Sequence, residues 1–305
     1  MKLWITGGTG FLGTALTRAA RARGIDVWNP NRDECDLMEP TNIEWVIGKL
    51  KITHIIHAAA MVGGIGANRK RPADFFYVNA QMGINLLHGA AQTGVIRKLV
   101  TIGTVCSYPA ETPTPFNEDD LWNGYPEPTN APYGLAKKML LVMGQAYRQQ
   151  YGFNSVYVMP TNLYGPNDHF GEGAHVIPNI IEKVARAQAN GDDTLTLWGD
   201  GTPTRDFLYV DDAAEAIMRT LETYDDPQPL NLGSGQEVSI KRLADIITDK
   251  MGYTGRVVWD TSYPNGQMRR QLDSTRAENA LGWKASTTFE DGIERTIAWY
   301  RESAR

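Results

Sequence analysis

The sequence predicts an α/β fold, in which a doubly wound parallel sheet is followed by a smaller α/β lobe. Strand-like and helix-like segments alternate through the first half of the chain, and a glycine-rich turn joins the first strand to the first helix. After about Asn162 this rhythm loosens. Helices that cross over between strands require parallel pairing, and right-handed crossovers place them on both faces of the sheet. We expect residues 1–165 to form the nucleotide-binding domain and residues 166–305 the substrate-binding lobe, with some chain exchanged between them.

Each expected element has its own pattern. Runs rich in apolar and β-branched residues predict strands at 2–6, 26–28, 54–58, 98–103 and 155–160. Apolar residues at helical spacing predict helices at 11–23, 42–50, 72–93 and 133–151, with a last helix near 289–302. Turn-rich stretches at 164–173 and 198–204 interrupt the shorter elements of the second half.

Composition and charge exclude several classes of protein. The net charge of the 305 residues is −5, so no broad basic field favours nucleic acid or an anionic membrane. No run approaches ~18 apolar residues, and the first strand begins at once, so we expect neither a membrane span nor a signal peptide. Only two cysteines, Cys35 and Cys106, are present, which indicates a cytoplasmic setting. No histidine or cysteine cluster has metal-ligand spacing, so no metal is expected.

A glycine-rich turn follows the first predicted strand, and it reads Gly7, Gly8, Thr9, Gly10, Phe11, Leu12 and Gly13. A tight turn, a pyrophosphate close to the backbone and a helix packed closely on the sheet each require a missing side chain. The helix N-terminus adds partial positive charge. The pattern alone is also that of a plain turn, but its place between a strand and a helix predicts a Rossmann-like dinucleotide site.

The end of the second predicted strand bears on the choice of dinucleotide. A carboxylate there would bind the ribose hydroxyls of NAD, whereas an arginine would neutralise the 2′-phosphate of NADP. Asn29 lies near the tip and Arg32 follows, which favours NADP(H). Asp33 argues for NAD, and Arg32 could also be a solvated loop charge.

A tyrosine and a lysine four residues apart predict a catalytic pair. Tyr133 and Lys137 fall on one face of the same predicted helix, where a cation would favour the phenolate. The spacing is common by chance, but here it follows a glycine-rich turn. Thr104, after the fourth strand, could hold a substrate carbonyl beside Tyr133, or could cap its own turn.

Together with several longer stretches, these residues make the chain resemble the GDP-L-fucose synthase family (GDP-4-keto-6-deoxymannose epimerase/reductases) of the extended short-chain dehydrogenases/reductases. The resemblance runs nearly end to end. It is carried by His57-Ala58-Ala59-Ala60-Met61-Val62-Gly63-Gly64-Ile65, Glu127-Pro128-Thr129-Asn130-Ala131-Pro132-Tyr133, Met159-Pro160-Thr161-Asn162-Leu163-Tyr164-Gly165-Pro166, His175-Val176-Ile177-Pro178 and Trp198-Gly199-Asp200-Gly201-Thr202-Pro203-Thr204-Arg205-Asp206-Phe207-Leu208.

The resemblance implies a two-stage reaction on a 4-keto sugar. The hydrogens at C3 and C5 are acidic because the carbanion delocalises into the carbonyl, and inversion takes a base on one face and an acid on the other. By similarity, Cys106 is the base and His175 the acid, and NADPH then reduces C4 while Tyr133 supplies the proton. Position alone allows blander roles: Cys106 as a small buried residue, His175 as an ordinary helix N-terminal residue.

The resemblance also implies binding residues. Arg205 would hold the pyrophosphate of a GDP-sugar, Lys183 and Arg270 are weaker basic candidates, and Trp198 would pack on the nucleotide or be buried in the second lobe. Asn162 would lie between nicotinamide and sugar, and Val176 would contact the substrate. The remaining cofactor contacts implied are Ala58, Ala59, Pro160, Leu163 and His175.

Departures from the family pattern leave alternatives open. Thr9 stands where a basic residue is common, Thr104 and Val105 replace serines, and Lys183 replaces an arginine. The leading hypothesis is a bifunctional 3,5-epimerase/4-reductase producing GDP-L-fucose. The alternatives are a reductase-only or epimerase-only enzyme on a related GDP-4-keto-deoxy sugar or heptose, and a non-catalytic NADP-binding regulator. A dehydratase is disfavoured because residues 104–106 lack a carboxylate pair. The two long helices resemble those that pair in family dimers, so a homodimer is expected.

Overall fold

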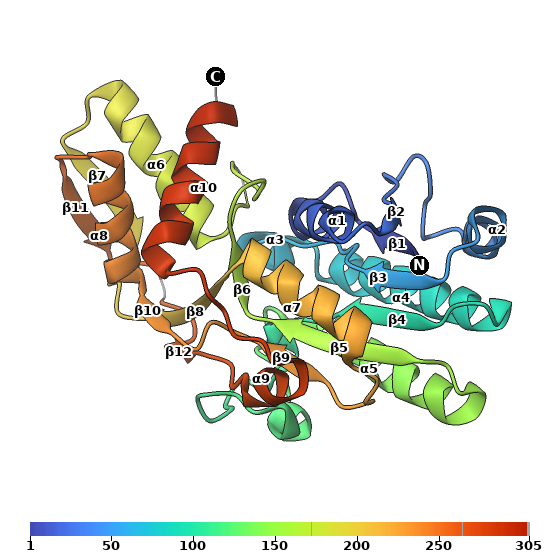
Figure 1. Cartoon of the computed structure of the whole chain (residues 1–305). Coiled ribbons are helices and arrows are strands. Elements are labelled where there is room, and N and C mark those ends of the chain that lie inside the picture. Colours follow the sequence, from blue (N-terminus) through green and yellow to red (C-terminus); the bar gives the residue numbers. More distant parts are fainter. Residues whose placement is uncertain (172, 264, 304–305) are drawn as a thin grey trace.

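The computed structural model describes residues 1–171, 173–263 and 265–303. Within these residues the main element is a six-stranded parallel sheet of order β2-β1-β3-β4-β5-β9 (Figure 1). Its strands are β1 (Lys2–Thr6), β2 (Asp26–Trp28), β3 (His54–His57), β4 (Lys98–Ile102), β5 (Ser155–Pro160) and β9 (Leu230–Leu232). The predicted doubly wound fold is confirmed.

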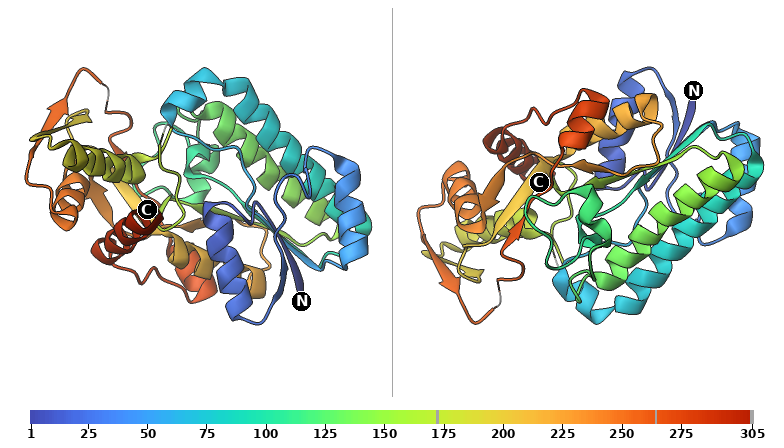
Figure 2. Two further views of the ribbon diagram at one scale, coloured as in Figure 1. Left: turned by 90° about the horizontal axis from the view of Figure 1, so that it is seen from above. Right: turned by 90° about the horizontal axis from the view of Figure 1, so that it is seen from below.

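Helices cover both faces of this sheet (Figure 2). Those on one face are α1 (Phe11–Ala22) and α7 (Val210–Thr223), and those on the other are α2 (Pro40–Leu50), α4 (Pro72–Thr93) and α5 (Ala131–Tyr151). Successive strand side chains alternate between the faces. Leu3 and Ile5 therefore pack against α1 and α7, whereas Trp4 between them joins the core under α2 and α4.

Most predicted elements appear within one or two residues of their expected bounds. The helices α2 and α5 begin two residues early, at Pro40 and Ala131, because proline is accepted in the first turn of a helix. Three short helices of the first half were not predicted: α3 (Ile65–Lys70), η1 (Val105–Ser107) and η2 (Glu118–Trp122). None of them is long enough to show a hydrophobic period.

The second lobe is built on two small sheets, which lie beside the carboxyl edge of the first (Figure 1). Among the described residues, one has the order β10-β8-β12 with β6 also paired to β8, and the other pairs β11 with β7. Its elements are β6 (Asn162–Tyr164), α6 (Val176–Asn190), β7 (Thr194–Trp198), β8 (Thr204–Tyr209), β10 (Glu237–Ser239), α8 (Ile240–Met251), β11 (Arg256–Asp260), β12 (Arg269–Arg270) and α10 (Phe289–Ser303). Residues of α6, α8 and α10 share its core. The helix α9 (Thr275–Leu281) instead packs on β9 and α7, in the core of the first sheet.

The chain passes between the two parts more than once. The helix α7 packs on α1, and β9 pairs in parallel with β5, so that Leu230 lies beside Val158. The first sheet is therefore completed by residues from the second half, and the division at residue 165 stays a prediction. No helix in the described ranges is both long and apolar enough to span a bilayer.

Candidate active site

The glycine-rich turn is held in place by contacts that exclude side chains. Gly7 has a φ of 66°, and a Cβ on it would lie 2.8 Å from the Cα of Ala59. A Cβ on Gly13 would lie 2.6 Å from the Cα of Gly8 and still closer to the carbonyl oxygen of Gly7. The turn therefore packs on Ala58 and Ala59, two of the predicted cofactor residues.

The start of α1 fits a pyrophosphate. Gly10 is the N-cap and provides no side-chain cap, and the first turn carries no acidic residue. The first backbone N–H groups of a helix have no intrahelical acceptor, and here they belong to the predicted residues Phe11, Leu12 and Gly13. An anionic group is the partner that such a terminus favours.

Two arginines lie near the end of β2, where the sequence predicts the adenosine of a dinucleotide. Arg32 is exposed, and its Nε lies 3.2 Å from Oδ2 of Asp36. Arg21, at the end of α1, donates from Nη2 to Oδ1 of Asn29 over 3.4 Å. Arg21 was not among the predicted cofactor residues, since nothing in the spacing shows that the end of α1 lies beside the end of β2.

The hydroxyl of Thr104 organises the short helix η1. Its Oγ1 accepts a hydrogen bond from the backbone N–H of Cys106 over 3.2 Å, so Thr104 does cap its own turn. The same side chain hydrogen-bonds Tyr133, an interaction that favours the phenolate. Capping and a contact with Tyr133 are thus compatible roles for this buried threonine.

Close packing of η1 on α5 brings Cys106 to Tyr133. A Cβ on Gly134 would lie 2.8 Å from the carbonyl carbon of Cys106 and closer still to its oxygen. Ser107 Oγ donates to the carbonyl oxygen of Gly134 over 2.9 Å. Only a glycine next to Tyr133 permits this approach, so the sequence positions the half-buried thiol beside the phenol.

Burial shifts the titration of both members of the Tyr133–Lys137 pair. Desolvation, and to a lesser degree the charge of Cys106, raises the pKa of Tyr133, while the Thr104 hydrogen bond opposes the shift. Lys137 is 2% exposed, and burial lowers its pKa to about 8. Burial and, to a lesser degree, the charge of Lys137 lower the pKa of His57. Nδ1 of His57 lies 2.9 Å from Thr6 Oγ1. His57 therefore lies within electrostatic reach of Lys137, which its sequence position did not indicate.

Two arginines lie side by side in the second lobe, and one of them contacts Cys106. Arg205 and Arg270 are register partners on the parallel strands β8 and β12, so their side chains leave the same face of the sheet. Nη1 of Arg270 lies 3.8 Å from Sγ of Cys106. Burial and the charge of Arg270 lower the pKa of Arg205 to about 10. Neither guanidinium forms an ion pair with a carboxylate of the described residues, which leaves a paired cationic site for an anion.

His175 approaches the site through another loop. It is the N-cap of α6, directly before Val176, and its ring makes no capping hydrogen bond. The backbone N–H of Gly64 donates to the carbonyl oxygen of Gly173 over 3.2 Å, which ties this loop to the Val62–Ile65 turn. The side chain of His175 is more than one-third exposed. Partial desolvation and, to a lesser degree, the charge of His169 lower its pKa.

The Val62–Ile65 turn is connected to Tyr133 through the ring of Phe75. A Cβ on Gly63 would lie 3.2 Å from the Phe75 ring, and that ring meets Tyr133 edge-on at 6.3 Å between centroids. In the described residues His175 forms no hydrogen bond with Cys106 or Tyr133. The structure thus brings Thr104, Cys106, Tyr133 and Arg270 together, with Lys137 one helical turn from Tyr133 on α5. It connects His175 to them only through neighbouring loops.

The nucleotide-binding candidates of the second lobe form an exposed aromatic cluster. Trp198 is 62% exposed, so of its two predicted roles the alternative of a ring buried in the second lobe is wrong. Its ring stacks on Tyr263 with centroids 4.2 Å apart and planes 6° apart. The Nζ of Lys183 lies 5.4 Å above the tryptophan ring and donates to the carbonyl oxygen of Thr196. Tyr263, which the sequence did not single out, completes this cluster.

Asn162 links the first domain to the arginine strand. Its Nδ2 donates to the carbonyl oxygen of Asp206 over 2.9 Å, beside Arg205. Pro160, at the end of β5, and Leu163, in β6, flank it along the chain. The predicted cofactor and substrate residues therefore meet where β5 gives way to β6.

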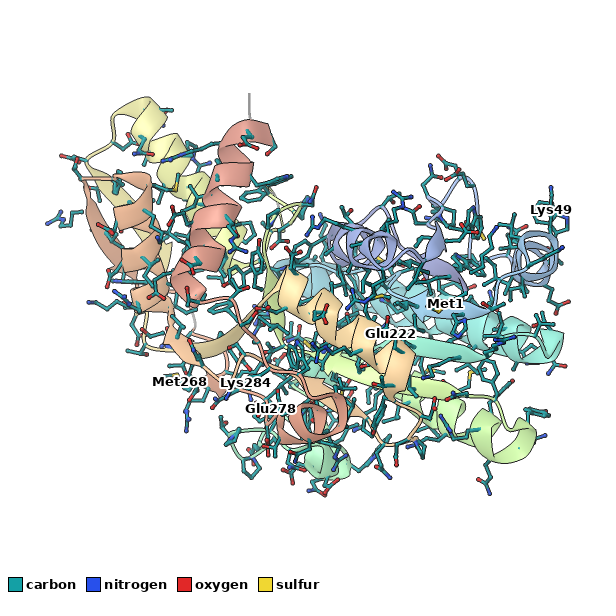
Figure 3. All side chains as sticks on the ribbon, in the orientation of Figure 1. Met1, Lys49, Glu222, Met268, Glu278 and Lys284 are labelled. Carbon is teal, nitrogen blue, oxygen red and sulfur yellow. The ribbon has the colours of Figure 1, made fainter. Side chains whose placement is uncertain are left out.

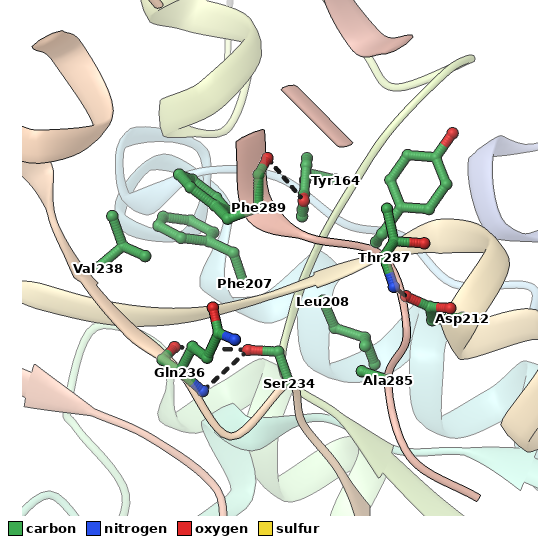
Figure 4. A pocket seen from close by; sticks show the side chains of 11 residues that line it. Tyr164, Phe207, Leu208, Asp212, Ser234, Gln236, Val238, Ala285, Thr287 and Phe289 are labelled. Atoms are coloured by element: carbon green, nitrogen blue, oxygen red, sulfur yellow. Dashed lines mark hydrogen bonds between the residues drawn. The ribbon is translucent and has the colours of Figure 1, made fainter. Parts of the chain in front are cut away.

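A small cavity between the two parts lies away from these groups (Figure 4). Its volume is about 20 Å³, and Tyr164, Phe207 and Phe289 line its apolar side. Asp212 on the other side accepts a hydrogen bond from the backbone N–H of Thr287 over 2.9 Å. A space that holds about one water is packing rather than a substrate site. No group of three or more metal-ligating side chains occurs in the part of the chain that the structure describes.

This sheet, with its glycine turn and its tyrosine–lysine pair, defines an extended short-chain dehydrogenase/reductase. The chain belongs to the NAD dependent epimerase/dehydratase family, whose model matches residues 3–233, and it is a homologue of the GDP-L-fucose synthases. One GDP-L-fucose synthase, from Sinorhizobium fredii, is 40% identical over 97% of this chain and 94% of its own length.

Two solved structures are also similar. A GDP-L-fucose synthetase from Naegleria fowleri bound to NADP has a TM-score of 0.91 at 29% identity, and covers 99% of this chain and 94% of its own. A GDP-6-OMe-4-keto-L-xylo-heptose reductase from C. jejuni has a TM-score of 0.92 at 26% identity, with 99% and 98% covered. The predicted family membership is confirmed.

Proposed function

We propose that this protein is a bifunctional 3,5-epimerase/4-reductase that converts GDP-4-keto-6-deoxy-D-mannose to GDP-L-fucose with NADPH. One observation carries the proposal: the phenol of Tyr133, the thiol of Cys106 and the guanidinium of Arg270 lie together at the end of the parallel sheet. Tyr133 would be the proton donor, Cys106 the base for the carbon acid and Arg270 the cation for the nucleotide diphosphate.

Reduction at C4 uses the tyrosine. NADPH, when bound at the glycine turn, supplies the hydride. Burial raises the pKa of Tyr133, so the phenol is protonated at neutral pH and can give its proton to the oxygen at C4. The hydroxyl of Thr104 hydrogen-bonds the phenol. We expect the ammonium of Lys137, one helical turn further along α5, to stabilise the phenolate that results.

Epimerisation uses the thiol. Cys106, as the thiolate, removes a proton from C3, releases that proton to solvent and then removes a proton from C5. At each step the negative charge passes to the C4 oxygen, beside Tyr133. His175 returns a proton to the opposite face at each carbon. The loop contacts through Gly64 and Phe75 support a position for His175 near the sugar.

Binding residues follow from charge and shape. The neighbouring guanidinium groups of Arg205 and Arg270 suit the two phosphates, and Trp198 with Lys183 suits the flat base. Arg32 and Arg21 suit the 2′-phosphate of NADP, and a relative's structure holds that cofactor. Val176, Asn162 and the cofactor residues of the first domain keep the roles expected from the resemblance.

A reductase that acts on a related GDP-4-keto heptose is the second candidate. It is favoured by the similarity to the C. jejuni heptose reductase. We further infer a homodimer, because α4 and α5 pack together and expose Tyr77 and Val142.

Oxidation of NADPH in the presence of GDP-4-keto-6-deoxy-D-mannose tests the proposed function, with product identity read by NMR and mass spectrometry. We expect GDP-L-fucose. Turnover of a GDP-4-keto heptose with none of the 6-deoxy sugar would favour the second candidate, and no NADPH oxidation with either sugar would leave only a binding role.

A further inference from the structure

Gln267 lies in the loop between β11 and β12, where it contacts both a substrate-binding candidate and the first domain. Its Oε1 accepts two hydrogen bonds from Arg270, from Nε over 3.1 Å and from Nη2 over 3.0 Å. Its Nε2 donates to the carbonyl oxygen of Ala110 over 3.2 Å. One half-buried amide therefore joins the guanidinium to a loop that is far away in the sequence. Met268, the next residue, is exposed and lies at the edge of the second lobe (Figure 3).

These contacts fix the direction of the Arg270 guanidinium. A guanidinium is planar and presents its five N–H donors as a rigid fork. Because Gln267 takes the edge formed by Nε and Nη2, the remaining edge is aimed elsewhere, and Nη1 lies 3.8 Å from Sγ of Cys106. The orientation of the cation toward the thiol is thus set by Gln267.

A neutral acceptor has a particular value at this position. Arg205 and Arg270 are side by side on neighbouring strands, and like charges directly opposite each other repel. A carboxylate in place of the amide would hold Arg270 equally well, but it would cancel the charge that an anionic ligand needs. An amide orients the guanidinium and leaves its charge intact.

We propose that Gln267 is a positioning residue, which directs the Arg270 guanidinium toward Cys106 and the substrate diphosphate without neutralising it. This inference rests on the proposed function, because it assumes a diphosphate ligand. The contact with Ala110 anchors the loop to the first domain. It thereby fixes the position of Arg270 relative to Cys106, although the two residues are 164 positions apart in the sequence.

The test compares Gln267→Ala, Gln267→Glu and the control Gln271→Ala in the full chain. Gln271 is on the same segment, but its Nε2 donates to the carbonyl oxygen of Gly235. The dissociation constant of GDP is measured by calorimetry, and the rate of alkylation of Cys106 by iodoacetamide is measured by mass spectrometry of its peptide. Cys35 is buried and serves as an internal reference.

We expect Gln267→Ala to weaken GDP binding about two- to tenfold, as the loss of ordinary hydrogen bonds does. It should also change the rate of alkylation of Cys106, because the guanidinium that lies 3.8 Å from its Sγ is displaced. Gln267→Glu should weaken GDP further, whereas Gln271→Ala should match the wild type.

Equal GDP affinity in the wild type and both Gln267 variants, or an equal loss in the Ala and Glu variants, would overturn the inference. A wild-type protein that does not bind GDP would instead count against the proposed function. In that case the alkylation rates still report whether Gln267 directs Arg270 toward Cys106, and unchanged rates would sink the inference too.

Discussion

Gly134 and Cys106 are in such close contact that no side chain fits between them. A Cβ on Gly134 would lie 2.8 Å from the carbonyl carbon of Cys106, and closer to its oxygen. Because Gly134 follows Tyr133, this contact sets the distance between the phenol of the reductase step and the thiol proposed for epimerisation.

Gly134→Ala should therefore displace η1 from α5. We expect unfolding free energy to fall by about 1–3 kcal/mol, the usual cost of overpacking, and activity to fall far more than stability. Gly48→Ala is the control, since Gly48 is in α2 and a methyl group on its Cα would have no neighbour within 4 Å. It should keep full activity and gain up to about 1 kcal/mol. Denaturant unfolding and NADPH oxidation measure both effects, and a fully active Gly134→Ala enzyme would contradict the packing account.

The pH dependence of turnover should report on Lys137. Burial lowers its pKa to about 8, and the lysine must be charged to stabilise the phenolate. We expect kcat/KM for the sugar to fall as the pH rises through about 8. In Lys137→Arg the descending limb should move to higher pH, because a guanidinium stays charged. An unchanged limb in this variant would assign it to another group.

Stability should change in the opposite direction over the same range. Between pH 8 and the ordinary lysine value of 10.5, the unfolded chain binds a proton at Lys137 that the folded chain has released. The free energy of unfolding therefore rises with pH in this window. Lys137→Met should remove this part of the rise, as denaturant unfolding at pH 8 and pH 10 would show.

The two arginines on neighbouring strands should bind the diphosphate. Arg205→Ala should raise KM for the GDP-sugar about 10- to 100-fold, the range for a hydrogen bond to a charged group. Arg269→Ala is the matched control, because Arg269 precedes Arg270 on β12 and its Nε donates to Glu237 Oε1 over 3.1 Å. Steady-state kinetics that show equal losses in both variants would contradict a specific phosphate site.

Cofactor preference should depend on the arginines beside the end of β2. We expect Arg32→Ala and Arg21→Ala each to raise KM for NADPH several-fold and to leave KM for NADH nearly unchanged, because only NADPH carries a 2′-phosphate. Asp36→Ala frees Arg32 from its ion pair and should act in the opposite sense. Equal effects on both dinucleotides would argue against NADP selectivity.

Sequence reasoning predicted the first sheet well because each of its elements has a local signal. Val100 and Ile102 in β4 and Leu16 in α1 follow the periods of a strand and a helix, and all three are buried. The glycine turn could be predicted equally well, since the strand, the turn and the helix are consecutive in the chain. Short elements such as η1 have no period and were missed.

Contacts between distant segments were beyond such reasoning. The approach of Arg270 to Cys106 depends on the parallel pairing of β12 with β8 and on the packing of η1 against α5. The same holds for Gln267 and Tyr263, which have no motif of their own. The exposure of Trp198 depends on which face of the β11–β7 pair the second lobe covers, and residue type alone pointed equally to a buried ring.

Isotope exchange tests the central claim most directly. The wild type and Cys106→Ser are incubated in D2O with GDP-4-keto-6-deoxy-D-mannose and NADPH, and the product is examined by NMR. We predict deuterium at both C3 and C5 in the wild-type product, and reduction without deuterium uptake in Cys106→Ser. A wild-type product that is reduced at C4 but carries no deuterium at either carbon would contradict epimerisation by this site.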